Sequence, residues 1–202
     1  MVNEGSVKVH SLHTQQDLVG RYGMDPLSAI RAAPDSLEKR KVLEICKHNL
    51  SALDRRSRPG HLTASVLVVY PIDRNILLLY HKKFQKWLQP GGHADGDPDL
   101  ARVALREAVE ETGIEGLRLL EPPIDVDIHK VDPPNEDPHE HYDLRYLVLS
   151  PSRAEPVGNN ESDRLRWVSI HDFSEVQADP SLYRLADRGL SVLSDLLEGE
   201  LI

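Results

Sequence analysis

Apolar and polar positions follow the period of an extended strand in several stretches of the middle of the chain. Residues 62–70 and 75–83 are runs of leucine and β-branched residues, separated by a short polar turn. In residues 123–131 and 141–149, apolar side chains take every second position, which places them on one face of a strand. A further short run covers residues 164–170. These five stretches predict the strands of a sheet.

Apolar residues recur at helical spacing before and after these strands. The first such stretch lies before Pro59, and Asp35, three residues before Glu38, predicts a capping pair at its start. Its apolar positions are Val42, Ile45, Cys46, Leu50 and Leu53. A second helix is predicted from a cap at Asp99 to an end at Gly113, and a third over residues 181–201. Between the strands and the second helix, residues 84–98 are predicted to be a loop.

This order of elements predicts an α/β fold in which a mixed sheet packs between helices. A length of 202 residues fits one domain with an extension. We therefore divide the chain into a helical extension, residues 1–58, and a main domain, residues 59–202. Three roles fit the extension: it shapes the binding pocket, caps it, or forms a homodimer contact.

Charge and cysteine content narrow the class of partner and compartment. The formal net charge of −9 disfavours nucleic acid backbones and anionic membranes as partners. Cys46 is the single cysteine, so no internal disulfide forms. No run is long and apolar enough to span a membrane, and the first residues have no apolar signal core. We therefore expect a cytoplasmic protein that acts on a small molecule.

The predicted helix over residues 99–112 carries three acidic side chains close together. One face of the helix is a stripe of small and apolar residues: Ala101, Leu105, Ala108 and Thr112. Glu107, Glu110 and Glu111 fall within about a third of the circumference on another side. An ordinary solvated face, balanced by Arg102 and Arg106, is one interpretation. The other is a site for a hard divalent cation, with a glycine turn that brings a backbone carbonyl to the same point.

The residues around this helix resemble the signature of the Nudix hydrolase family. The matching positions are Gly92, Arg106, Glu107, Ala108, Glu110, Glu111, Gly113 and Ile114. One position differs, because Pro98 stands where the signature has its first glutamate, and Asp97 and Asp99 flank it. The resemblance covers roughly residues 58–170 and leaves the N-terminal helical part outside the Nudix core.

This resemblance implies a Nudix-type α/β/α sandwich and a pyrophosphohydrolase that uses Mg²⁺ or Mn²⁺. It implies that Glu107, Glu110 and Glu111 bind the metal together with the Gly92 carbonyl, and that Arg106 orients them. Water would attack one phosphorus of a diphosphate in a nucleotide-derived substrate. One of the glutamates, or a carboxylate elsewhere, would act as the base. Glu161 is one candidate for that distant carboxylate.

A second group of polar residues follows the two strands after the helix. If residues 124–131 and 141–149 pair as a hairpin, six side chains share one surface: Asp125, Asp127, His129, His141, Asp143 and Arg145. Three interpretations remain: the lining of the substrate cleft opposite the glutamate helix, an exposed hairpin, or a separate metal site that includes His139. We expect His129, His141, Asp143 and Arg145 to bind substrate. His93, beside the glycine pair, is expected to face the phosphates or to lie in solvent.

Two other functions fit the same resemblance. A nucleotide sensor that does not cleave its ligand would not need the complete glutamate set. A prenyl diphosphate isomerase would need a cysteine in a cleft strand, whereas Cys46 lies in the N-terminal helical part. The hydrolase is therefore the leading hypothesis.

Overall fold

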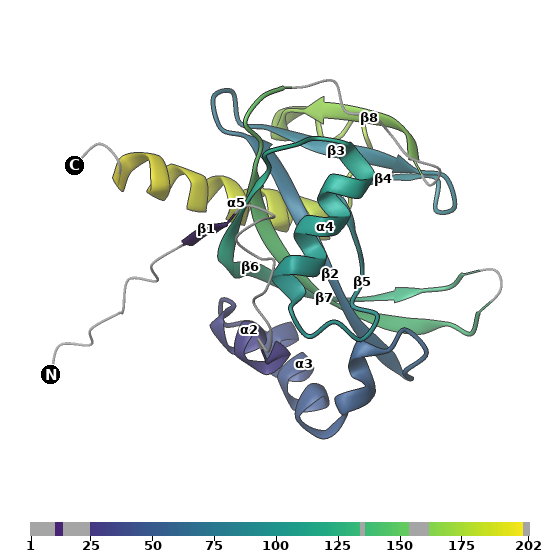
Figure 1. Ribbon diagram of the computed structural model, residues 1–202. Helices are drawn as coiled ribbons and strands as arrows, with labels where there is room; N and C mark the ends of the chain where they lie inside the picture. Colours follow the sequence, from purple (N-terminus) through teal and green to yellow (C-terminus); the bar gives the residue numbers. More distant parts are fainter. Residues whose placement is uncertain (1–10, 14–24, 134–135, 154–161, 200–202) are drawn as a thin grey trace, which may run out of the picture.

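A computed structural model describes residues 11–13, 25–133, 136–153 and 162–199 (Figure 1). The helices are α2 (Pro26–Ala32), α3 (Leu37–His48), α4 (Leu100–Thr112) and α5 (Pro180–Gly199), with 3₁₀ turns η1 (Leu50–Leu53) and η2 (Ile170–Asp172). The strands are β1 (Ser11–His13), β2 (Gly60–Tyr70), β3 (Asn75–His81), β4 (Lys86–Leu88), β5 (Gly91–His93), β6 (Arg118–Val131), β7 (His139–Leu149) and β8 (Ser162–Val168). None of the described helices combines the length and apolar character needed to cross a bilayer.

The strands form one mixed sheet within the described residues. Its order is β1-β6-β7-β2-β3-β4, with β5 added to β2 and β8 added to β3. β2 and β7 run parallel, and the other pairs are antiparallel. The predicted mixed sheet between helices is confirmed, and so is the hairpin of β6 and β7, in which Asp127 lies opposite Asp143 and His129 opposite His141.

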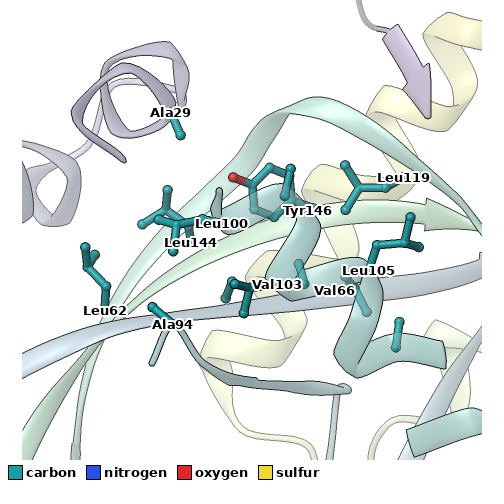
Figure 2. Close-up of a cluster of buried hydrophobic side chains, with 14 of the residues drawn as sticks. Ala29, Leu62, Val66, Ala94, Leu100, Val103, Leu105, Leu119, Leu144 and Tyr146 are labelled. Carbon is teal, nitrogen blue, oxygen red and sulfur yellow. The ribbon is translucent and has the colours of Figure 1, made fainter. Parts of the chain in front are cut away.

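Helices cover both faces of this sheet (Figure 1). On one face, Leu62 and Val66 of β2 pack with Leu100, Val103 and other side chains of α4 (Figure 2). On the other face, apolar residues of β2, β3, β6 and β7 pack against α5. Because side chains alternate along a strand, residues 62, 64 and 66 face α4, and residues 61, 63 and 65 face the opposite side.

The helix that carries the glutamates begins and ends as its sequence predicts. The Asp99 side chain accepts a hydrogen bond from the Arg102 backbone N–H at 3.1 Å. Gly113 ends the helix with a φ of 66°, a conformation that glycine adopts without steric cost. The predicted small-residue stripe is buried along its whole length. The stripe fixes the side of α4 that faces the sheet, and therefore where the glutamates point.

The N-terminal helices share the core of the sheet. Ile30 of α2 and Val42 of α3 are fully buried in the cluster that contains α4 and the even positions of β2. The predicted cap at Asp35 is wrong by one residue. Ser36 is the cap, because its extended backbone places Oγ 3.0 Å from the Lys39 N–H. The Asp35 carboxylate instead binds Arg40.

Two other local predictions also differ from the structure. The first helix does not continue to Leu53: α3 ends at His48, and η1 follows as a separate turn. The predicted loop over residues 84–98 contains two strands of three residues each, β4 and β5. Strands of three residues are too short to show a periodic pattern in their sequence. They form because they pair with β3 and β2.

Candidate active site

The three glutamates of α4 lie in different environments. Glu111 is buried, with 6% of its surface exposed. The Glu107 side chain is 20% exposed and that of Glu110 is 61% exposed. The exposure of the three side chains therefore increases from Glu111 through Glu107 to Glu110.

The glycine turn of β5 meets this helix at two of the three glutamates. The Gly91 backbone N–H donates a hydrogen bond to Glu111 Oε2 at 2.9 Å. A Cβ atom at Gly92 would lie 2.5 Å from Cδ of Glu107. Only a glycine therefore leaves the Glu107 carboxylate in its place. The glycine turn therefore lies directly against two carboxylates, and carboxylate oxygens are ligands that hard divalent cations prefer.

Arg106 lies between two of the glutamates. Its Nη2 is 2.8 Å from Glu107 Oε1, and its Nε is 3.9 Å from Glu110 Oε1. One guanidinium group thus contacts carboxylates on both sides, and the orienting role of Arg106 stays a prediction.

The two aspartates beside Pro98 have partners within the protein. Asp97 forms a two-point ion pair with Arg102, with atoms 2.6 Å and 3.0 Å apart. Asp99 caps α4, and burial raises the pKa of its carboxyl. Both carboxylates therefore contact the start of the helix, and Asp99 Oδ2 is buried without a hydrogen-bond partner among the described residues.

The charged end of the polar row is covered by α5. Arg145 is 3% exposed and binds Asp143 and Asp127 at 3.0 Å and 2.9 Å. Arg184 of α5 binds Asp127 at 2.6 Å, and Arg188 binds Asp125. Ion pairs thus join the sheet to α5, with the aspartates buried and the side chains of Arg184 and Arg188 partly exposed.

Asp143 also accepts hydrogen bonds from two hydroxyl groups of β2, Thr63 at 2.9 Å and Ser65 at 2.6 Å. Direct substrate contact by Asp143 and Arg145 stays a prediction, and it would require this network to open. The polar row of β6 and β7 also lies on the face of the sheet away from α4. The hypothesis that this row lines a cleft opposite the glutamate helix is therefore wrong.

The other end of the same row is a cluster of histidines. The His61 ring centre lies 5.1 Å from His93, 4.9 Å from His139 and 4.8 Å from His141. His129 stands next to the cluster, 5.3 Å from His141 and hydrogen-bonded to Asp127 at 3.0 Å. His93, expected in a loop, lies in β5 and projects to this face.

His61 joins this group without any prediction from its sequence context. Its partner is set by the parallel pairing of β2 with β7, which aligns His61 with His141. The alternation of side chains along β2 predicts the face of the sheet on which His61 lies. It does not predict which strand pairs with β2, so it is a weak signal for this cluster.

Three histidines of this cluster, His61, His93 and His141, have lowered pKa values and are neutral at physiological pH. Burial and the neighbouring histidines lower the pKa of His141 to about 2 and that of His61 to about 4. Burial, together with the positive charge of Arg55, also lowers the pKa of His93. Neutral rings keep a lone pair for binding a proton donor or a metal ion.

An open pocket of about 680 Å³ lies at the tip of the β6–β7 hairpin. Arginines from the segment before β2 and acidic residues before β7 line it: Arg55, Arg56, Arg58, Glu136 and Asp137. Arg55 also binds Asp95, four residues after Gly91. The segment between η1 and β2 therefore borders both the glycine turn and the pocket. Glu161 lies outside the described residues.

Comparison with known proteins identifies a family. The chain matches the model of the NUDIX domain over residues 60–188, more than half of its length. Comparison with curated proteins gives no match.

Solved structures share the fold. A NUDIX-family hydrolase from Clostridium perfringens is 27% identical, with 67% of this chain and 97% of that chain covered and a TM-score of 0.54. A C. elegans Ap4A hydrolase in a binary complex is 18% identical, with 66% and 98% covered and a TM-score of 0.52. The E. coli dihydroneopterin triphosphate pyrophosphohydrolase is 15% identical, with 64% and 93% covered and a TM-score of 0.53.

Proposed function

Since the chain belongs to the Nudix hydrolase family, we propose that it cleaves a diphosphate linkage in a nucleotide-derived small molecule, with a divalent metal ion. The observation that carries this proposal is the contact of the glycine turn with the glutamates of α4. The Glu111 carboxylate holds the Gly91 N–H, and the Glu107 carboxylate fills the space beside Gly92.

We propose Mg²⁺ or Mn²⁺ as the ion, held by Glu107, Glu110, Glu111 and the Gly92 carbonyl. Four oxygen donors from one helix and one turn suit these hard cations. Such an ion neutralises phosphate charge and lowers the pKa of bound water.

We assign a role to each of the remaining residues of the proposed site. Arg106 fixes the directions of Glu107 and Glu110 through its ion pairs. Glu110, the most exposed of the three, is the carboxylate best placed to take a proton from attacking water. Among the predicted substrate ligands, His93 is the nearest in sequence to the glycine turn, and His129 and His141 continue the same row.

The substrate class follows from the similar structures and from charge. Two neighbours are named an Ap4A hydrolase and a dihydroneopterin triphosphate pyrophosphohydrolase. Dinucleoside polyphosphates and nucleoside triphosphates are therefore the first substrates to test. We propose that the arginines of the 680 Å³ pocket contact the rest of an anionic substrate in exchange for their ion pairs with Asp95, Asp54 and Glu136.

We also propose that residues 1–58 act as an extension of the catalytic domain, residues 59–202, and that the protein works in the cytoplasm. Arg55, Arg56 and Arg58 at the end of the extension line the pocket, so pocket shaping is the role with the most support. The proposed reducing compartment rests on Cys46, which is unpaired and buried, so that burial raises the pKa of its thiol to about 11.

The test is chromatographic separation and quantification of the cleavage products, such as nucleotides, sugar phosphates and pyrophosphate, from a panel of dinucleoside polyphosphates, nucleoside triphosphates, nucleotide sugars and prenyl diphosphates. Each is incubated with Mg²⁺, with Mn²⁺ and with chelator. We expect metal-dependent cleavage that falls at least about 100-fold in the Glu110→Gln/Glu111→Gln double variant, because metal stabilisation of the transition state is worth several kcal/mol.

Glu115→Gln is the matched control, since Glu115 is exposed just after α4 and should leave the rate unchanged. Tight nucleotide binding without turnover under any metal would overturn the hydrolase and favour a sensor. Isomerisation of a prenyl diphosphate would overturn it in favour of the third hypothesis.

A further inference from the structure

We propose that His61, His139 and His141 form a second metal site, which takes a transition metal ion of the zinc class. This site is separate from the proposed Mg²⁺ or Mn²⁺ site on α4, and it does not depend on the proposed reaction.

The first observation is the geometry of the three rings. One nitrogen from each of His61, His139 and His141 can be chosen so that the three atoms all lie within 4.8 Å of one another. Two nitrogens bound to one zinc ion at about 2.0–2.1 Å are separated by less than twice that distance. Small rotations of the rings about their side-chain bonds therefore bring all three onto one ion.

The second observation is that the rings carry nitrogens without other partners. Both ring nitrogens of His61 and Nε2 of His141 are buried and have no hydrogen-bond partner among the described residues. The Ser57 carbonyl lies near His61 but makes no hydrogen bond of normal geometry with it. A buried polar atom without a partner costs free energy. A bound metal ion removes that cost for the nitrogens it contacts.

The third observation is the orientation of His139. Its Nδ1 lies 2.7 Å from the Asp137 backbone carbonyl, so Nδ1 carries the proton and donates it. Nε2 of the same ring is then the atom with the free lone pair. A histidine that binds a metal usually donates its other ring N–H to a carbonyl or carboxylate in this way.

Burial and charge favour a cation over an anion here. His61 is 1% exposed and His139 is 4% exposed. Protonating several of these adjacent rings would place like charges about 5 Å apart, so they do not form an anion site. Neutral imidazoles are the ligands that zinc and related ions prefer, whereas Mg²⁺ prefers oxygen. Asp95 and Glu136 place negative charge beside His93, and their ion-pair partners Arg55 and Arg58 place positive charge beside His93 and His61.

His93 is a fourth histidine beside the three proposed zinc ligands. Its ring centre lies 5.1 Å from both His61 and His141. It follows Gly92 in β5, and consecutive strand residues project to opposite faces. The histidine cluster and Glu107 therefore flank β5 from its two sides, which keeps the two proposed metal sites apart.

The experiment measures zinc held by the full-length chain. The protein is stripped with chelator, supplied with Zn²⁺ in the presence of excess Mg²⁺, desalted and analysed for metal content. We expect one zinc ion per chain. His61→Gln, His139→Gln and His141→Gln should each weaken zinc binding by at least about 100-fold, because even an outer partner of a ligand is typically worth about 10- to 100-fold.

Three controls separate this site from other sources of binding. His129→Gln changes a ring beside the cluster, and His171→Gln changes an exposed histidine of η2; both should retain zinc. The Glu110→Gln/Glu111→Gln double variant should also retain zinc, even where catalysis is lost. Thermal unfolding of each metal-free variant shows that it is folded before zinc is added.

X-ray absorption of the zinc-loaded wild type gives a second readout that needs no variant. We expect at least three imidazole nitrogens around the ion. The proposal is overturned if the wild type takes up no zinc under excess Mg²⁺, if zinc is lost only in the glutamate variant, or if the ion is surrounded by carboxylate oxygen without imidazole.

Discussion

At the scale of single residues, one missing side chain shapes the proposed active site. Gly92 lies in an ordinary strand, so its backbone does not require glycine. The requirement comes from its neighbour, because an added Cβ would meet the Glu107 carboxylate. Glycine is therefore needed here for the position of Glu107, a proposed metal ligand, and not for the conformation of the chain.

The variant Gly92→Ala tests whether the absence of a side chain at this position keeps the Glu107 carboxylate in place. The Glu107 carboxylate is the end of a flexible side chain and can move aside, so the free energy of unfolding should change by less than about 1 kcal/mol. The metal-dependent rate should fall about 100-fold, since a shift of about 1 Å in a positioned group costs that much. The rate of formation of the cleavage products and denaturant unfolding measure the two effects.

Gly96→Ala in the same segment is the matched control with the reverse pattern. Gly96 has a φ of 87° and nothing near its missing Cβ. Alanine there should cost about 1–2 kcal/mol of stability through backbone strain and leave the rate unchanged. A Gly92→Ala enzyme with normal activity would contradict the proposed role of the contact.

At the scale of elements, α5 is attached to the sheet by charge as well as by apolar packing. Both Arg145 of β7 and Arg184 of α5 bind the Asp127 carboxylate, and both also form ion pairs with Asp125. Burial alone would raise the pKa of Asp127. The hydrogen bond with His129 and the charges of the two arginines outweigh burial and hold this pKa well below its usual range.

Asp127→Asn should therefore destabilise the protein in a pH-dependent manner. At pH 7 the loss should be about 3–5 kcal/mol, the typical cost of removing one partner of a buried pair. A carboxyl with a lowered folded pKa contributes stability above its unfolded pKa and loses it as the pH falls through the folded value. The difference between wild type and variant should thus be constant from about pH 5 to 7 and shrink below about pH 4.

Denaturant unfolding across this pH range measures the difference. Asp35→Asn is the comparison, because the Asp35–Arg40 pair is exposed and should contribute little at any pH. A difference for Asp127→Asn that stayed constant down to pH 2 would contradict the assignment of the effect to this carboxylate.

At the scale of the whole molecule, the N-terminal helices and the catalytic domain share one hydrophobic core. Ile30 of α2 is fully buried in the cluster that α4 and β2 also form, and Figure 2 shows Ala29 of α2 facing the same space. The extension is separate in sequence, but its packing links it to the sheet that carries the site. We therefore expect one cooperative unfolding transition.

Ile30→Ala tests this link, because both tryptophans of the chain, Trp87 in β4 and Trp167 in β8, lie outside the extension. Removing a buried isoleucine side chain typically costs about 2–5 kcal/mol. Tryptophan fluorescence should then show the transition at lower denaturant with an unchanged slope. Leu37→Ala, at a side chain that is 59% exposed, should shift it by less than about 0.5 kcal/mol.

Two separate transitions, with the tryptophan signal unmoved in Ile30→Ala, would show that the extension unfolds by itself. In that case the pocket arginines before β2 would depend on a unit that can detach from the site.

The sequence by itself determined the features that depend on interactions over a few residues. The alternation of β6 and β7 predicts their hairpin, and Asp99 and Gly113 predict both ends of α4. The three glutamates and the glycine turn also lie within one short segment, so their spacing predicts that they meet. Helix caps, strand alternation and helical spacing depend on residues that are close together in the sequence, so the sequence alone predicts them.

Only the tertiary structure decided which distant segments meet. The parallel pairing of β2 with β7 joins Thr63 to Asp143, 80 residues apart, and brings His61 into the histidine cluster. The docking of α5 turns Asp127 and Arg145 into a buried network, and pairing with β2 turns a glycine turn into a strand. These contacts follow from how layers pack and which strands become neighbours, and the sequence pattern of a single strand carries no information about its neighbour.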